Sequence, residues 1–186
     1  PVMAEAVSAA LMWPVATSPS GRTGGGVSQL PEGWKTQHKL GASLAVPGDY
    51  EAHVFPDAVA FQVNEGQVHR QVLLLRWDVP QGSARERAKY WYREYTTSKK
   101  LDDVQIVLFD MEVEGRKSEA LTMTYRGNGG QLWRKSELFH NANGAVWKIV
   151  VDWAIENEQD TGGDELFDGV LSTFKTGDAD RPGERS

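Results

Sequence analysis

The chain has 186 residues, a formal net charge of −6 and no cysteine. This length suits one domain with a sizeable core, and the negative charge argues against a general nucleic-acid binder, which normally carries a basic surface. Without cysteine the chain forms no disulfide, zinc-thiolate site or iron–sulfur cluster and has no thiol nucleophile. An ordinary globular domain remains.

Residues 1–29 differ in composition from everything that follows. Ala4 to Trp13 predicts a short helix ended by Pro14, and a linker rich in Ser, Gly and Pro comes next. The apolar segment is too short to span a bilayer. Because the chain starts at Pro1 rather than Met, we expect processing or a longer reading frame, with a signal peptide or membrane anchor upstream.

The apolar residues of this arm have no obvious place in a sandwich core. They are Val7, Leu11, Met12 and Trp13. An apolar helix in a groove is a common recognition mode. The arm is expected either to return onto its own domain or to lie in the groove of a partner.

The folded unit is expected over residues 30–176, followed by a polar tail over residues 177–186. Its first half predicts four strands, at Trp34 to His38, Ser43 to Val46, Ala58 to Val63 and Val68 to Trp77. Val72 to Leu75 is apolar on both faces, which is typical of a central strand covered on both sides.

A helix is predicted after these strands. Ser83 and Glu86 have capping-box spacing. The apolar stripe that follows consists of Ala84, Ala88, Trp91, Tyr92 and Tyr95. The basic residues around it are interpreted as a solvated helix face, with an acidic-partner patch as the alternative; they are Arg85, Arg87, Lys89, Arg93, Lys99 and Lys100.

In the second half, Val104 to Val113 is again apolar on both faces and is expected to be a second central strand. A hairpin follows, and Val146 to Trp153 predicts the last strand. A final helix is expected from about Gly163 to Thr173, with Thr161 and Asp164 at its start.

The hairpin has the clearest alternation in the chain. Leu121, Met123 and Tyr125 should face a helix layer, and Asn128-Gly129 supplies the turn. The basic residues at its ends are expected to keep that end of the sheet soluble and to offer a secondary contact surface. They are Arg126, Arg134 and Lys135.

Short connections favour a mainly antiparallel sheet, and strands apolar on both faces require layers on both sides. The predicted fold class is therefore α+β, an antiparallel sheet with helices on both faces.

The motifs LPEGW, SLAVP, EALTMTY, LWRKSELF and VWKIVVDW, with a terminal helix ending in STF, resemble the Mog1/PsbP-like α/β/α sandwich superfamily. The likeness is strongest to its actinobacterial extracytoplasmic domains, which are linked to Ser/Thr protein kinases or are secreted or lipid-anchored. It covers Leu30 to Phe174. It implies a binding or assembly module, and it carries over no catalytic or ligand residues.

Few residue patterns in the chain indicate a catalytic or metal-binding site. The four histidines (His38, His53, His69 and His140) lack metal-pair spacing and are interpreted as surface or edge residues, with metal binding or acid–base chemistry as the alternative. No G-x-S-x-G elbow for a serine nucleophile is present. The acidic stretch from Asp152 to Asp168 is interpreted as a solvated loop, with a weak cation site or basic-partner surface as the alternative.

These patterns predict a non-catalytic interaction or sensor domain without cofactor or metal. A protein partner is expected, nucleic acid is not, and a membrane is expected only through an upstream anchor. The location is predicted to be extracytoplasmic, with cytoplasmic as the alternative. Two other hypotheses remain: a subunit of a larger assembly, and a small-molecule or lipid carrier, or an enzyme, with a pocket near Trp77, Trp91 and Trp153.

Overall fold

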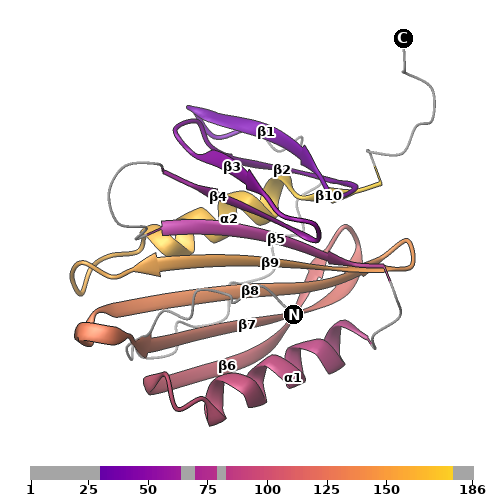
Figure 1. The fold of residues 1–186 in the computed structure, drawn as a ribbon. Coiled ribbons are helices and arrows are strands. Elements are labelled where there is room, and N and C mark those ends of the chain that lie inside the picture. Colours follow the sequence, from indigo (N-terminus) through magenta and orange to yellow (C-terminus); the bar gives the residue numbers. More distant parts are fainter. Residues whose placement is uncertain (1–29, 64–69, 79–82, 178–186) are drawn as a thin grey trace.

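The computed structural model describes residues 30–63, 70–78 and 83–177. The arm with Val7, Leu11, Met12 and Trp13 lies outside these residues, as does His69. Within the described ranges the strands form two sheets, and two helices pack against them (Figure 1). The mainly antiparallel α+β architecture confirms the predicted fold class.

The larger sheet has seven strands among the described residues, in the order β3-β4-β5-β9-β8-β7-β6. They are β3 (Glu51–Val54), β4 (Ala58–Gln62), β5 (Arg70–Trp77), β6 (Asp102–Val113), β7 (Arg116–Arg126), β8 (Leu132–Ala142) and β9 (Ala145–Ala154). Every neighbouring pair is antiparallel.

The smaller sheet has the order β1-β2-β10. Its strands are β1 (Trp34–Lys39), β2 (Ala42–Pro47) and β10 (Lys175–Thr176). The helices are α1 (Ala84–Thr97) and α2 (Gly162–Thr173), and η1 (Asn128–Gly130) is a 3-10 turn at the tip of the β7–β8 hairpin. The short β3 and β10 were not predicted; neither has enough residues for a visible alternation.

Three hairpins close with two-residue turns in which both residues have positive φ. This is the type I′ geometry, whose twist matches that of the flanking strands. The pairs are Leu40-Gly41, Glu114-Gly115 and Asn143-Gly144. Such turns fix the register of the strands that they join, and in this way they fix which side chains enter the core.

The two helices cover opposite faces of the large sheet. Leu138 on β8 belongs to the cluster that packs with α2, whereas its neighbour Phe139 belongs to the cluster under α1. Successive strand residues point to opposite faces. Leu121, Met123 and Tyr125 lie under α1, so the prediction for the odd-numbered residues of β7 is confirmed.

Ser83 caps α1 in a full capping box with Glu86, as predicted. The helix packs through Ala84, Ala88, Trp91 and Tyr95, whereas Tyr92 is 37% exposed. Its inclusion in the apolar stripe was wrong, because residue 92 is turned about 100° around the helix from residue 91.

The prediction that Val104 to Val113 is a central strand was also wrong. β6 lies at the edge of the large sheet, and β9, which is buried along its whole length, lies in the interior. The apolar residues of β6 do pack, with Val104, Ile106 and Leu108 lying under α1. Apolar residues on both faces therefore indicated covering layers, but not a strand neighbour on each side.

Candidate functional site

Four charged side chains are buried on the α1 face of the large sheet. Lys135 and Glu137 come from β8, and Lys148 and Asp152 come from β9; none is more than 1% exposed. Their even spacing along each strand places all four on one face. The register of the β8–β9 pair then places Lys135 directly opposite Asp152.

The first half of this network fixes α1 on the sheet. Lys148 Nζ lies 3.0 Å from Glu137 Oε1, and the Tyr95 hydroxyl of α1 donates to the same oxygen at 2.5 Å. The ammonium also lies 3.7 Å from the centroid of the Trp91 ring. A buried cation is tolerated where a carboxylate and an aromatic face replace its water.

The second half ties four strands together around Asp152. Its carboxylate accepts a hydrogen bond from Gln71 on β5 at 3.1 Å and one from Tyr125 on β7 at 3.2 Å. Lys135 Nζ lies 3.7 Å away. Such a network specifies how the layers meet. At 1% exposure or less its charged groups offer no route for a substrate.

A second polar group, with Ser118 and His140 buried and Glu114 at the surface, has the residue types of a hydrolase triad. Ser118 Oγ lies 2.6 Å from His140 Nδ1, and Glu114 Oε2 lies 3.1 Å from His140 Nε2. Ser118 is 2% exposed and His140 is not exposed. A nucleophile has to reach substrate, so this trio acts in the architecture of the domain.

The trio fastens the C-terminal strand. Glu114 Oε1 accepts the backbone N–H of Thr176 at 2.8 Å, and Glu114 Oε2 accepts the Thr176 hydroxyl at 2.7 Å. Burial lowers the pKa of His140; the hydrogen bond and charge of Glu114 oppose this shift, and Arg116 adds to it. The prediction of a surface or edge histidine was therefore wrong for His140. Its alternation with the core residue Leu138 was the signal that placed it inside.

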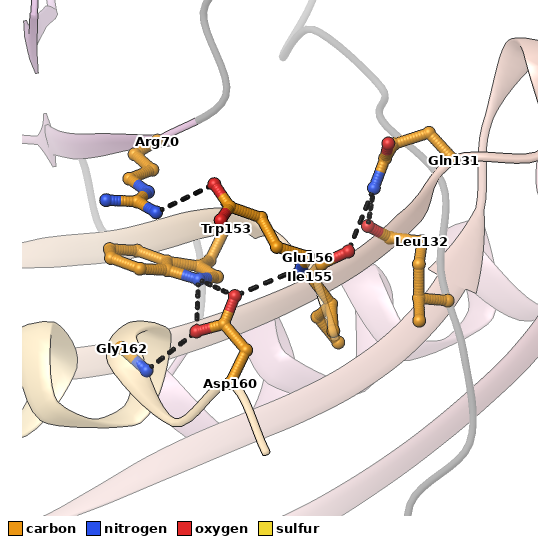
Figure 2. Close-up of polar contacts among 8 residues, drawn as sticks. All are labelled: Arg70, Gln131, Leu132, Trp153, Ile155, Glu156, Asp160 and Gly162. Atoms are coloured by element: carbon orange, nitrogen blue, oxygen red, sulfur yellow. Dashed lines mark hydrogen bonds and ion pairs between the residues drawn. The ribbon is translucent and has the colours of Figure 1, made fainter. Parts of the chain in front are cut away.

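Figure 2 shows the polar corner where β9 leads into α2. Asp160 accepts hydrogen bonds from Trp153 Nε1 at 2.9 Å and from the backbone N–H groups of Glu156 and Gly162 at 3.1 Å each. The Arg70 guanidinium lies 4.0 Å from the centroid of the Trp153 ring and 3.0 Å from Glu156 Oε1. Burial alone raises the pKa of Asp160, but these hydrogen bonds and the charge of Arg70 outweigh it and lower the pKa.

The contacts in this corner give structural roles to acids of the stretch from Asp152 to Asp168. Asp160, rather than Thr161, accepts an N–H at the start of α2, and the Thr161 hydroxyl donates to Glu165. Asp152 is buried in the network under α1. Among the described residues no cluster of three or more His, Asp or Glu side chains could hold a metal ion.

The basic residues predicted at the hairpin end lie in three different settings. Arg126 pairs with Asp103 at 3.2 Å, and Arg134 donates to Asp164 at 2.6 Å. Lys135 is 1% exposed, so its assignment to a soluble hairpin end was wrong. The residue alternates with Trp133 and Glu137 toward the α1 face, where Asp152 lies opposite.

The three tryptophans of the predicted pocket do not line one cavity. Trp153 packs in the cluster under α2, Trp91 in the cluster under α1, and Trp77 in a third cluster around Val150. Trp153 and Trp91 therefore lie on opposite faces of the sheet, and the pocket was a wrong prediction.

A small cleft of about 120 Å³ opens between α1 and the β6–β7 edge. Leu108, Phe109 and Ala88 give it an apolar wall. Asp110 and Glu119 are opposite each other on β6 and β7. Burial first, and then the charge and hydrogen bond of Asp110, raise the pKa of Glu119.

Arg85 and Lys89 of α1 complete the rim of this cleft. Arg85 Nε lies 3.9 Å from Glu119 Oε1, and both bases oppose the rise in the Glu119 pKa. The cleft is too small for a drug-sized ligand, which needs about 300 Å³ or more, but it is large enough for a side chain.

Nothing among the described helices is both long and apolar enough to cross a membrane. No protein-family model matches the chain, and no curated protein matches it.

Solved structures share the fold. The solution structure of cyanobacterial PsbP (CyanoP) from Synechocystis sp. PCC 6803 superposes with a TM-score of 0.60 at 13% identity, over 84% of this chain and 99% of that one. A mutant of the protein Mog1 superposes with a TM-score of 0.54 at 9% identity, over 78% of this chain and 97% of that one. At such identities these likenesses show the fold alone: the chain has the Mog1/PsbP-like α+β fold.

Proposed function

We propose that this chain is a non-catalytic protein-interaction or sensor domain. The observation that carries the proposal is where its polar groups lie. Ser118 and His140 of the trio and the charged network under α1 are buried in the core, and Glu114 lies at the surface end of the trio. Exposed large apolar side chains occur instead on α1, with Tyr90 and Tyr92, and on the edge strands, with Val54 on β3 and Val107 on β6, which suits contact with another macromolecule.

The arm is the proposed docking segment. Val7, Leu11, Met12 and Trp13 form an apolar set ahead of a linker rich in Ser and Gly, and an amphipathic helix docks in a groove through such anchors. Arg126, whose side chain is 39% exposed, is a secondary contact on the domain itself.

The experiment compares the full chain with a chain lacking Pro1 to Ser20. Both are used as bait in quantitative affinity purification from the native organism. Two point variants, Leu11→Ser and Trp13→Ser, test the anchors, and Ser8→Ala is the matched control. We expect specific co-purifying proteins to be lost with the deletion and with the two anchor variants, and to be kept with the control.

Melting temperatures decide between a docking arm and part of the fold. We expect the deletion to change the melting temperature by less than about 4 °C, the size of shift that about 1 kcal/mol produces in a domain of this length. A much larger drop would show that the arm stabilises its own domain. Unchanged co-purification would refute the docking role.

The proposed location is extracytoplasmic, with an upstream tether, as in the actinobacterial kinase-linked domains that the sequence motifs resemble. The neighbour structures support the fold and leave this finer likeness as a proposal. A fusion of the complete reading frame to a phosphatase that is active only outside the cytoplasm tests the location. We expect phosphatase activity in intact cells, and an inactive but stable fusion would contradict it.

A further inference from the structure

β6 is the longest strand of the described residues, and within those residues no strand pairs with its outer side. Along an edge strand about half of the backbone N–H and C=O groups point away from the sheet and can pair with an added strand. β6 spans 12 residues, whereas β3 at the opposite edge spans four. Val107, in the middle of β6, is 43% exposed.

The charge on β6 has one sign. The strand carries Asp102, Asp103, Asp110 and Glu112 and no Lys or Arg. Among the described residues Asp103 pairs with Arg126, and Lys117 of β7 lies opposite Glu112 on the inner side of the strand. The outer side of β6 has no base of its own. Natural edges are often protected by charged side chains, most often Lys. An acidic edge repels acidic strands and attracts basic ones.

We propose that β6 takes up an extended, basic segment of a partner protein as an additional antiparallel strand. This inference rests on the proposed interaction function and names the surface and the chemistry of the partner. The added backbone pairs with the outer groups of β6, while its lysine or arginine side chains lie beside Asp110 and Glu112. This is strand addition, in which main-chain hydrogen bonds supply affinity and side chains supply specificity.

The cleft under α1 adds a side-chain site to this edge. Leu108 and Asp110 of β6 line its mouth, and Ala88 and Phe109 give it an apolar wall. An added strand places every second side chain on this face of the sheet. An aliphatic side chain of the added strand can therefore enter the cleft, whereas Arg85 and Lys89 on the rim disfavour a cation inside it.

A second copy of the chain fits the edge poorly. Pairing two β6 strands joins two edges that each carry four acids and no Lys or Arg. Like charges directly opposite each other destabilise a strand pair. The acids of β6 therefore act against self-association, while they favour a basic partner.

The test uses short end-blocked peptides and the full chain. The probe is a peptide of alternating lysine and valine. One control peptide replaces lysine with glutamate, and another keeps the lysine–valine sequence but carries N-methyl groups along one backbone edge. We expect saturable binding of the probe in fluorescence anisotropy, weaker binding of both controls, and slowed amide hydrogen exchange over residues 102–113.

Matched variants separate strand addition from general attraction to an acidic protein. Asp110→Asn with Glu112→Gln should weaken binding about fivefold, the size expected for two exposed ion pairs. Glu32→Gln with Glu158→Gln makes the same change in net charge at exposed positions away from the edge, and it should leave binding unchanged. Val107→Lys should abolish binding, whereas Val54→Lys, at a 64% exposed position on β3, should not.

Equal binding of the N-methylated peptide, equal weakening by both pairs of charge variants, or protection at β3 instead of β6 would overturn the proposal. Absence of binding would overturn it as well. The proposed docking role of the arm is tested by a different experiment, the co-purification with the chain that lacks the arm, so each proposal can be refuted without the other. If arm-dependent partners persist while β6 stays unprotected, only this inference is refuted.

Discussion

At the scale of single residues, Asp160 shows how one carboxylate organises a corner. It joins Trp153 at the end of β9 to the first turn of α2. Replacing Asp160 with Ala should cost about 1–2 kcal/mol in the free energy of unfolding, as the loss of a helix cap does. Asn, which keeps one acceptor, should cost less. Urea denaturation at neutral pH measures both, and equal stabilities for wild type and the Ala variant would contradict the role.

The pH dependence of this effect has a definite sign. Because the pKa of Asp160 is lowered in the folded state, its stabilisation is present above the unfolded pKa, about 3.9, and disappears as the pH falls through the folded pKa. The difference between wild type and the Asn variant should therefore shrink in acid.

The fold favours the neutral form of His140, whereas it favours the charged form of Asp160. Its folded pKa is lowered, so the unfolded chain binds a proton first as the pH falls below about 6.5. Stability should decrease in that window by up to about 1.4 kcal/mol per pH unit. His140→Gln should flatten this slope in denaturation measured across pH, whereas His38→Gln, at an exposed position on β1, should leave it intact. A wild-type stability that does not change across this window would contradict the prediction.

At the scale of elements, the pair between Lys148 and Glu137 fixes α1 over the sheet. Glu137→Ala alone should cost about 3–5 kcal/mol, because a buried ammonium then lacks this carboxylate. Glu137→Leu together with Lys148→Met should cost less than the single change. Chemical denaturation of the three proteins checks this. A double variant as unstable as the single one would show that the pair itself is not the cause.

Sequence patterns predicted the elements that repeat regularly. The capping box at Ser83 and the alternation of β7 were both confirmed. Charged residues within strands misled the predictions, since Lys135 and His140 were assigned to surfaces but are buried beside counter-groups. Alternation along β8 places both side chains on core-facing positions, but the groups that compensate a buried charge come from distant strands, and periodicity within one strand does not show them.

The edge position of β6 was missed for a related reason. Packing under α1 and strand pairing both leave an apolar pattern, and the pattern does not distinguish them. The four acids of the strand were the better signal, because charged side chains are common on edge strands.

At the scale of the whole molecule, burial predicts a hierarchy of opening. All residues of β9 are buried, and β9 pairs with β5 and β8. Its amides should exchange hydrogen only when the molecule unfolds globally, whereas the outward amides of β6 should exchange much faster. Native-state hydrogen exchange read out residue by residue checks this, and equal protection of the two strands would contradict it.

The small sheet also determines how the domain bears load. β1 begins opposite Pro47 at one end of β2, whereas β10 ends opposite Ala42 at the other, where Gly177 donates to Gly41 at 3.1 Å. β1 and β10 therefore run in the same direction on either side of β2 (Figure 1). Tension between residues 30 and 177 would shear these ladders along their length instead of unzipping them bond by bond, which is the mechanically stronger arrangement.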